Sequence, residues 1–322
     1  MKKVFIGLSL VIGLVIFSVV FMQNLDLFMS IEKLKYVYLI PYLFFSMLIF
    51  SIHVLRWKLI LLAHNRSIKF TQLFLYKVAG FAISYFTPAA HIGGEPVRAW
   101  LLKRHRLKFH EALSSVMIDK FLEILVSVVL GIVGFLLLIL KFTVSNNTAI
   151  IVVLALGSAA TGVWFFYART VARKPFVSLL LRFSGRKAIV KARKIVEKSE
   201  ELVSSFFNRK KRLLLVSIIL TFVNIFLMFF EYHFLFMVFG IDSDIGALFL
   251  VTALIAISYI MPVPAGLGVL EVSEAGLFSL MAMKSAIGLG ISLIVRIKDS
   301  TIALIGLAYL ALKGIKALGF RQ

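Results

Sequence analysis

The sequence predicts an all-α integral membrane protein with about six transmembrane helices and two re-entrant hairpins, arranged as a repeat of inverted topology. Three observations lead to this fold class. Of the 322 residues, 61% are hydrophobic and only 16% are charged, and the mean hydropathy of +1.00 is well above that of soluble domains. The Lys and Arg residues flank apolar stretches instead of forming one basic face. In addition, one seven-residue phrase occurs twice.

The repeated phrase is Ala-Ile-Ser-Tyr-Phe-Thr-Pro at residues 82–88, which returns as Ala-Ile-Ser-Tyr-Ile-Met-Pro at residues 256–262, 174 positions later. Gly94 and Gly268 have the same separation. In each copy an apolar run ends at a proline and is followed by glycines and then by charged residues. A long internal repeat in a membrane chain indicates two structural halves.

The first apolar run covers residues 4–22 and follows Lys2 and Lys3. It is long enough to cross about 30 Å of hydrocarbon. It lacks the short apolar core and the small residues of a cleaved signal peptide, so we expect an uncleaved first span with a cytosolic N-terminus. A second span over residues 37–55 returns to the cytosol at Arg56.

The first hairpin follows. Its apolar part, residues 73–86, is shorter than the roughly twenty residues that a full crossing requires, and a polar stretch comes next. Five basic residues within 98–108 place its exit on the cytosolic side where it entered. Irregular backbone over residues 88–94 is tolerable at membrane depth only if it is buried in protein or lines a wet cavity.

A third span over residues 113–140 and a fourth over residues 149–167 are predicted next. The stretch 169–212 is strongly basic and carries weakly polar or apolar residues at steps of three and four, which predicts an amphipathic helix on the cytosolic membrane surface, where it anchors the protein. These residues are Ile189, Ala192, Val196, Ser199, Val203 and Phe206.

A fifth span over residues 213–239 leads to the second hairpin, which dips over residues 247–260, turns, and returns by Met283. A sixth span covers residues 287–312. The first hairpin enters from the cytosol and the second from outside, so the two halves are expected to be inverted relative to each other. The halves cover residues 37–140 and 213–312 of a single membrane domain over residues 1–322. Two re-entrant hairpins of opposite orientation form a binding site that can open to either side of the membrane in turn, which is typical of transporters.

The distribution of charge supports this orientation. Of the 36 Lys and Arg residues, 28 lie in predicted cytosolic stretches and four in outside ones, as the positive-inside rule requires. We therefore expect a multi-pass protein of the cytoplasmic (inner) membrane with both termini in the cytosol. The same topology, together with anionic lipid headgroups, explains the net charge of +21 better than nucleic-acid binding does. The absence of cysteine excludes disulfides, thiolate metal sites and cysteine nucleophiles.

Several charged residues fall inside predicted spans. Asp119, Lys120 and Glu123 can share one helix face, and Arg296 and Asp299 lie at the matching place of the second half. An unpaired charge in the bilayer costs several kcal/mol, so such residues face a partner or a water-filled cavity. The alternative to a functional site is a set of fixed interhelical ion pairs. Examples would be Arg296 with Glu231 or Asp299 with Lys120.

The candidate substrate site combines these charges with the two turns. Arg98, Arg296 and the free amides of the broken helices are expected to hold a phosphate, while the acidic residues contact cationic headgroup parts or take up coupling protons. Interfacial snorkelling of Glu95 and Arg98 and simple turn formation by the glycines are the structural alternatives. The predicted substrate-binding residues are Pro88, Gly93, Gly94, Glu95, Arg98, Asp119, Lys120, Glu123, Glu231, Pro262, Gly266, Gly268, Glu271, Glu274, Arg296 and Asp299.

No catalytic residue, cofactor site or metal site is predicted. The six histidines lack metal-ligand spacing. The sequence contains no phosphate-binding loop and no nucleophile elbow. A dinucleotide-binding glycine motif directly follows a β-strand, whereas no strand is predicted before Gly93-Gly94-Glu95.

Three motifs carry a resemblance to a known family: Gly-Gly-Glu-Pro-Val-Arg at residues 93–98, Val-Met-Ile-Asp-Lys at 116–120 and Pro-Val-Pro-Ala-Gly-Leu-Gly-Val-Leu-Glu at 262–271. From about Val37 onward the chain resembles the lysylphosphatidylglycerol synthase transmembrane-region family of flippase-like proteins. The membrane part of multiple peptide resistance factors in that family is held to move aminoacylated phosphatidylglycerol between leaflets. The resemblance therefore implies lipid translocation.

Two features differ from the family pattern. Asp119-Lys120 stands where members often have Asp-Arg, and residues 265–268 lack the adjacent glycines, so the resemblance leaves the headgroup contacts open. Bifunctional members continue into a soluble aminoacyl-transfer domain. The sequence ends ten residues after the last predicted span, so we expect no lysyl transfer.

The sequence thus predicts a lipid flippase that moves a phosphate-containing lipid, either a phospholipid or a polyprenyl-phosphate lipid. The alternative is a membrane enzyme or accessory subunit in lipid-linked glycan or aminoacyl-lipid synthesis. The lack of a large soluble catalytic segment in the sequence favours the transporter. The expected partner is a membrane lipid with a phosphate headgroup and not a nucleic acid. Homo-oligomerisation, the lipid, the direction and the energy source stay open.

Overall fold

The computed structural model describes residues 34–87, 93–141, 146–174, 187–260 and 263–313. Throughout these ranges the regular structure is helical and no strand occurs, which confirms the all-α class. Three helices are long and apolar enough to cross a membrane: Tyr36–Leu62, Phe109–Leu140 and Lys211–Val238. The predicted first span, residues 4–22, lies outside the described residues. The number of spans and the re-entrant hairpins stay predictions.

The first half contains two long helices that enclose a hairpin of shorter ones. Helix α3 covers Leu39–Leu62, α4 covers Phe70–Phe86, α5 covers Glu95–Leu102 and α6 covers Phe109–Lys141. Helix α3 extends well beyond residue 55, where the sequence placed the end of the second span. Its Arg56 is completely buried instead of marking a cytosolic flank, because it pairs with acidic side chains inside the molecule.

The second half repeats this order of elements. Helix α10 covers Lys211–Val238, α11 covers Ile245–Ile260, α12 covers Val269–Leu280 and α13 covers Ser285–Leu312. Helix α13 is as long as α10 but has three charged residues near its middle, Arg296, Lys298 and Asp299. Between the halves lie α7, Asn146–Val171, and α9, Lys187–Arg209.

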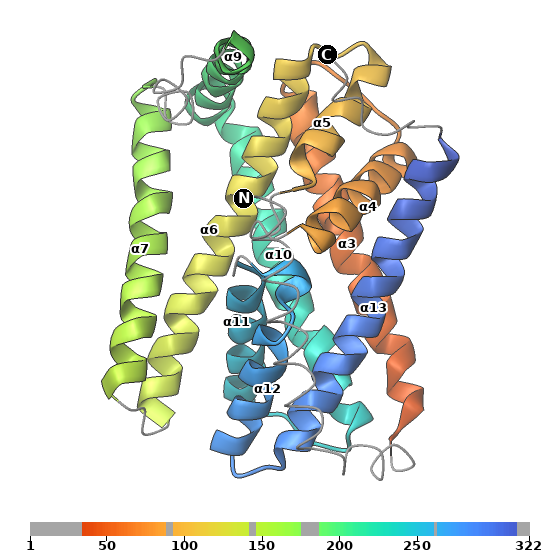
Figure 1. Cartoon of the computed structure of the whole chain (residues 1–322), viewed down its shortest axis with the longest axis vertical. Helices are drawn as coiled ribbons and strands as arrows, with labels where there is room; N and C mark the ends of the chain where they lie inside the picture. Colours follow the sequence, from red (N-terminus) through yellow and green to blue (C-terminus); the bar gives the residue numbers. More distant parts are fainter. Residues whose placement is uncertain (1–33, 88–92, 142–145, 175–186, 261–262, 314–322) are drawn as a thin grey trace.

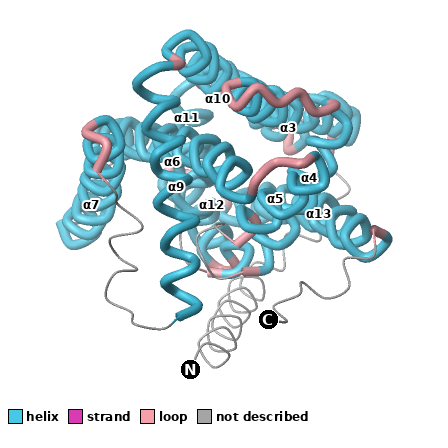
Figure 2. Tube along the Cα trace, turned by 90° about the horizontal axis from the view of Figure 1, so that it is seen from above, coloured by secondary structure: helices cyan, strands magenta, loops and turns pink. Residues whose placement is uncertain are grey.

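The two halves interlock through reciprocal contacts. Helix α3 packs along α10, which is its counterpart in the other half. Helix α4 of the first hairpin packs against α13, and α11 of the second hairpin packs against α6 (Figures 1 and 2). Each hairpin is therefore held by the last long helix of the opposite half. This exchange brings residues that are far apart in the sequence to one shared interior.

Glycines permit two of these cross-half contacts. A Cβ atom at Gly306 of α13 would lie 2.4 Å from the carbonyl oxygen of Val78 in α4. A Cβ atom at Gly134 of α6 would lie 2.3 Å from the Cβ of Ala253 in α11. Real Cβ atoms essentially never approach so closely, so the helices can pack at this distance only without a side chain at these positions.

Helix α9 lies within the basic stretch that the sequence singled out. Its Ser199, Val203 and Phe206 are buried, and the helix packs against α6 and α7 (Figure 1). Val203 and Phe206 join a cluster with Ile118 and Leu122 of α6. These three residues of the face that was expected to lie on the membrane are therefore buried within the protein, two of them against the apolar flank of α6. The contact of the basic face with lipid stays a prediction.

Candidate functional site

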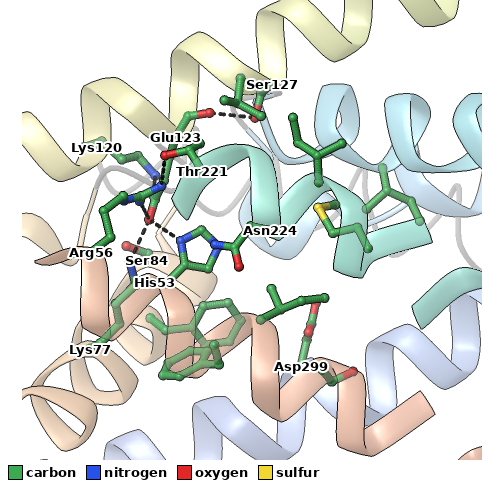
Figure 3. Close-up of a pocket in the computed structure, with 18 of the residues that line it drawn as sticks. His53, Arg56, Lys77, Ser84, Lys120, Glu123, Ser127, Thr221, Asn224 and Asp299 are labelled. Atoms are coloured by element: carbon green, nitrogen blue, oxygen red, sulfur yellow. Dashed lines mark hydrogen bonds and ion pairs between the residues drawn. The ribbon is translucent and has the colours of Figure 1, made fainter. Parts of the chain in front are cut away.

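A cavity of about 340 Å³ lies where the two halves meet. Helices α3, α4, α5 and α6 of the first half and α10, α11 and α13 of the second contribute to its lining (Figure 3). Its walls combine apolar side chains with an unusual number of charged ones. Charged side chains between apolar helices are costly unless they are paired with one another or hydrated. The charged groups that are not fully paired are therefore the ones that can bind a ligand.

Asp119 on α6 is the centre of the larger ion network. Its Oδ1 accepts hydrogen bonds from Nε and Nη2 of Arg56, at 2.9 and 2.8 Å. Its Oδ2 accepts from Nη2 of Arg98 at 2.6 Å and from Nζ of Lys77 at 3.1 Å. Three cations from α3, α4 and α5 thus converge on one carboxylate that has no exposed surface. Charge-assisted hydrogen bonds of this kind stabilise a buried carboxylate.

Glu123, one turn further along α6, faces the cavity itself. Its Oε1 accepts a hydrogen bond from Nζ of Lys77 at 2.7 Å and lies 3.5 Å from Nδ1 of His53. Lys120 lies 3.5 Å from Glu123 and 3.7 Å from Glu95. These outer groups are more accessible than Asp119 and form the polar wall of the first half.

A smaller network forms the wall of the second half. Nζ of Lys298 on α13 donates to Oε1 of Glu231 on α10 at 2.8 Å and lies 3.8 Å from Asp299. The hydroxyl of Ser46 on α3 also donates to Glu231. The observed partner of Glu231 is therefore Lys298, whereas the sequence suggested Arg296 as one example.

Arg296 instead stabilises the second turn. It makes a bidentate pair with Glu271, at 2.7 and 3.1 Å, and donates to the carbonyl oxygens of Ala265 and Gly266, the latter at 2.8 Å. The second carboxylate oxygen of Glu271 also accepts from the amide of Gly268 at 2.9 Å. Ala265, Gly266 and Gly268 have left-handed φ angles of 54°, 62° and 79°, which explains the glycines here.

The first turn is closed by backbone contacts. The amide of Gly94 donates to the hydroxyl of Ser84 at 2.8 Å. A Cβ atom at Gly94 would lie 1.9 Å from the carbonyl oxygen of Gly80, so only glycine lets α5 approach α4 here. The amides of Gly94 and Gly268 are thus already bonded. The expectation that free amides hold a phosphate is not met at these two positions.

The predicted site residues separate into groups. Six line the cavity, Asp119 lies directly behind it, and Gly266, Gly268, Glu271 and Arg296 belong to the second turn. Gly93 and Gly94 belong to the first turn, and Pro88 and Pro262 lie outside the described residues. Glu274 is completely buried in α12, and neither carboxylate oxygen has a hydrogen-bond partner within the described part of the chain. The six cavity residues are Glu95, Arg98, Lys120, Glu123, Glu231 and Asp299.

Sequence reasoning missed several lining residues. Arg56 was predicted at the cytosolic end of the second span, and Lys77 was not among the predicted site residues, yet both line the cavity. The polar residues of α10 had a signal: Ser217, Thr221 and Asn224 follow one another at steps of four and three, and such spacing puts them on one helix face. Ser217, Thr221 and Asn224 are buried, and the last two line the cavity.

The charges around the cavity balance. Among the described residues, five cations and five acids take part in the two networks. The cations are Arg56, Lys77, Arg98, Lys120 and Lys298, and the acids are Glu95, Asp119, Glu123, Glu231 and Asp299. A balanced set of charges avoids the cost of a net buried charge. It also allows a charged group of a ligand to replace one side chain as the partner of another. The described residues contain no group of three or more His, Asp or Glu that could hold a metal ion.

Comparisons with known proteins add the family context. Residues 4–306 match the family described as "Lysylphosphatidylglycerol synthase TM region". The chain is 25% identical over 305 residues to a UPF0104 membrane protein of Pyrococcus horikoshii, covering 87% of this chain and 89% of that protein. It is 28% identical over 118 residues to a UPF0104 membrane protein of Methanothermobacter thermautotrophicus, which covers 36% of this chain and 35% of the relative. No solved structure matches the chain.

Proposed function

The chain belongs to the lysylphosphatidylglycerol synthase transmembrane-region family of membrane proteins, and from this premise we propose that it moves a lipid with a phosphate headgroup between the two leaflets. The observation that carries this proposal is the cavity between the halves, whose walls include five basic side chains. A headgroup needs such a polar path because hydrocarbon cannot solvate it, whereas the lipid tails can stay in the bilayer.

The reciprocal packing supports a transport mechanism. We propose that the pairs α4–α5 and α11–α12 are re-entrant hairpins of inverted topology. Each packs on the last helix of the other half. Alternating access can then arise when one half rocks against the other and opens the shared cavity to each face in turn. The hydrogen bonds between the halves, from Arg56 to Thr221 and from Ser46 to Glu231, would break and form in this motion, while the ion pair of Glu231 with Lys298 stays within the second half.

Lys120 is the cation best placed to receive a phosphate. Its contacts with Glu123 and Glu95, at 3.5 and 3.7 Å, are longer than ordinary charge-assisted hydrogen bonds of about 2.7–2.9 Å. Its side chain is 18% exposed, more than those of Lys77 and Arg98. Lys120 is therefore more accessible to a phosphate in the cavity than Arg98, which is held by Asp119 at 2.6 Å.

Reconstitution in liposomes tests the proposal. Dithionite quenches a fluorescent label on an acyl chain of phosphatidylglycerol only in the outer leaflet, so liposomes with the wild-type protein should be quenched more completely than protein-free ones. Lys120→Gln should slow this movement roughly tenfold, because one charge-assisted contact to the phosphate is worth about 1.5–3 kcal/mol. Lys194→Gln, on the exposed side of α9, is the matched control and should leave the rate unchanged.

The opposite results would be equally clear. If the wild-type protein gave no additional quenching with phosphatidylglycerol, phosphatidylethanolamine or a polyprenyl phosphate, the translocase proposal would fail. If both Lys variants behaved like the wild-type protein, translocation would stand but Lys120 would not bind the headgroup.

A further inference from the structure

We propose that the cavity recognises hydroxyl groups of the lipid headgroup and that Asn224 on α10 is the residue that binds them. The inference rests on the proposed lipid translocation and adds the chemical class of the headgroup: a phosphodiester with a polyol, such as glycerol or a sugar. Asn224 is only 3% exposed, and its side chain lines the cavity (Figure 3). Neither its Oδ1 nor its Nδ2 has a hydrogen-bond partner among the described residues.

A buried amide without partners is unusual. Most buried side-chain polar atoms in proteins are hydrogen-bonded, and each one left unpaired is destabilising. The neighbouring polar residue on the same face, Thr221, is fully engaged: it donates to the carbonyl oxygen of Ser217 at 2.7 Å and accepts from Nη1 of Arg56 at 3.1 Å. Asn224 therefore differs from its surroundings in presenting both a donor and an acceptor to the cavity.

The other unpaired atoms of the cavity show the same mixture. Oε2 of Glu95 is an acceptor without a partner, Nε of Arg98 is a donor without one, and Nδ1 of His53 makes no hydrogen bond and only approaches Glu123 at 3.5 Å, again among the described residues. By contrast, both carboxylate oxygens of Glu123 are ion-paired with lysines, and Oε1 of Glu231 is ion-paired with Lys298. Most charged groups around the cavity are thus paired with one another, and the unpaired atoms that remain for a ligand include both hydrogen-bond donors and acceptors.

This mixture selects one kind of chemical group. A phosphate only accepts hydrogen bonds, and an ammonium only donates them, whereas a hydroxyl does both. A primary amide that donates through Nδ2 and accepts through Oδ1 can bind one or two hydroxyls at once. Asn224 also lies between the two charged walls, with Lys120 and Glu123 on one side and Asp299 on the other in Figure 3. It is placed to bind the part of a headgroup that extends beyond the phosphate.

The test compares two lipids that differ only in their hydroxyls. Phosphatidylglycerol and phosphatidylpropanol have the same charge and the same three-carbon headgroup, and both can carry an acyl-chain fluorophore. In liposomes the wild-type protein should move phosphatidylglycerol about tenfold faster, since a site built to bond a hydroxyl discriminates against an analogue that lacks it. Asn224→Leu, which keeps a similar volume, should bring the ratio of the two rates close to one. Asn224→Ser should restore part of the preference.

The control and the contrary outcomes complete the experiment. Asn208→Leu is the control, because Asn208 on α9 bonds Ser204 and the carbonyl of Val171, not the cavity, and its ratio should equal that of the wild type. Equal wild-type rates for the two lipids, or an equal loss for both in Asn224→Leu, would overturn the inference while leaving translocation intact.

A second measurement separates this inference from the proposed function. Retention of each lipid on the purified protein in mild detergent, measured by mass spectrometry, requires binding but no transport. If no lipid were translocated, preferential retention of phosphatidylglycerol that is lost in Asn224→Leu would still support the hydroxyl site. Equal retention of both lipids by the wild-type protein would refute it.

Discussion

At the scale of single residues, the interior of this protein is organised by carboxylates that are surrounded by cations. Asp119 has no exposed surface, yet it accepts hydrogen bonds from Arg56, Lys77 and Arg98. Moving one carboxylate out of water is expensive, and only several well-aligned donors offset that cost. The same logic explains why Glu271 and Arg296 pair at the second turn, where both are buried.

Asp119→Asn should therefore destabilise the protein strongly. The change removes the negative charge but leaves the three cations buried, and breaking such a pair typically costs about 3–5 kcal/mol. We expect a clearly lower melting temperature in detergent than for the wild-type protein.

A surface pair provides the matched control for this prediction. Arg193 and Glu197 on α9 form an ion pair at 2.8 Å, but the Glu197 side chain is 35% exposed. Glu197→Gln should cost less than about 1 kcal/mol because water screens exposed pairs. Equal melting temperatures for Asp119→Asn and the wild type would show that the network around Asp119 does not stabilise the fold.

At the scale of elements, two short hairpins depend on close contact with long helices of the other half. Gly306 lies in the α4–α13 contact, and Gly134 lies in the α6–α11 contact. A third glycine, Gly288 of α13, lies where a Cβ atom would be 2.4 Å from the carbonyl oxygen of Glu274 in α12. Small residues at such positions let helix backbones approach, and dispersion contacts then stabilise the pair without any hydrophobic driving force from water.

Gly306→Leu should disrupt the contact between α13 and α4. A leucine side chain would collide with the backbone of Val78 and with Ala82, whose Cβ is 2.7 Å from the ideal position. Overpacking of this kind costs about 1–3 kcal/mol, and the loss should appear as a lower melting temperature and slower lipid translocation.

Gly276→Leu is the control at this scale. Gly276 on α12 is exposed and has no heavy atom within 4 Å of an added Cβ, so the change should not destabilise the protein, and the higher helix propensity of leucine should if anything stabilise it by about 0.5–1 kcal/mol. If Gly306→Leu were as stable as Gly276→Leu, the tight packing of α4 on α13 would not hold the halves together.

At the scale of the whole molecule, two similar halves share one polar interior. Helices α3 and α10 run side by side as counterparts, and the other cross-half contacts are reciprocal. If the halves are inverted, the loop after α5 and the loop before α13 must open to opposite sides of the membrane. Lys103 in the first loop and Lys284 in the second are both exposed.

Single cysteines can test this arrangement, because the chain has no cysteine of its own. In intact cells a membrane-impermeant maleimide should label Lys284→Cys and not Lys103→Cys. After permeabilisation both variants should be labelled, which controls for accessibility. Labelling of both variants, or of neither, in intact cells would contradict the inverted halves.

The sequence anticipated much of the site but not its pairing. Six predicted residues line the cavity, because charges within apolar segments must face one another or water. Arg56 was missed because a basic residue after an apolar run usually marks a membrane boundary, whereas here α3 continues to Leu62. Asn224 was missed although its spacing from Ser217 and Thr221 puts the three on one helix face, because neutral polar residues in a long apolar helix give a weaker signal than charges.

By itself, the sequence determined the membrane class, the internal repeat, and the presence of charges that require partners. These properties follow from composition, segment length and spacing, which are local. The tertiary structure alone decided that Asp119 pairs with Arg56, 63 positions earlier, and that Arg296 stabilises a turn instead of lining the cavity. Helical periodicity shows which residues share a face, but only the packing of one helix on another determines what that face meets.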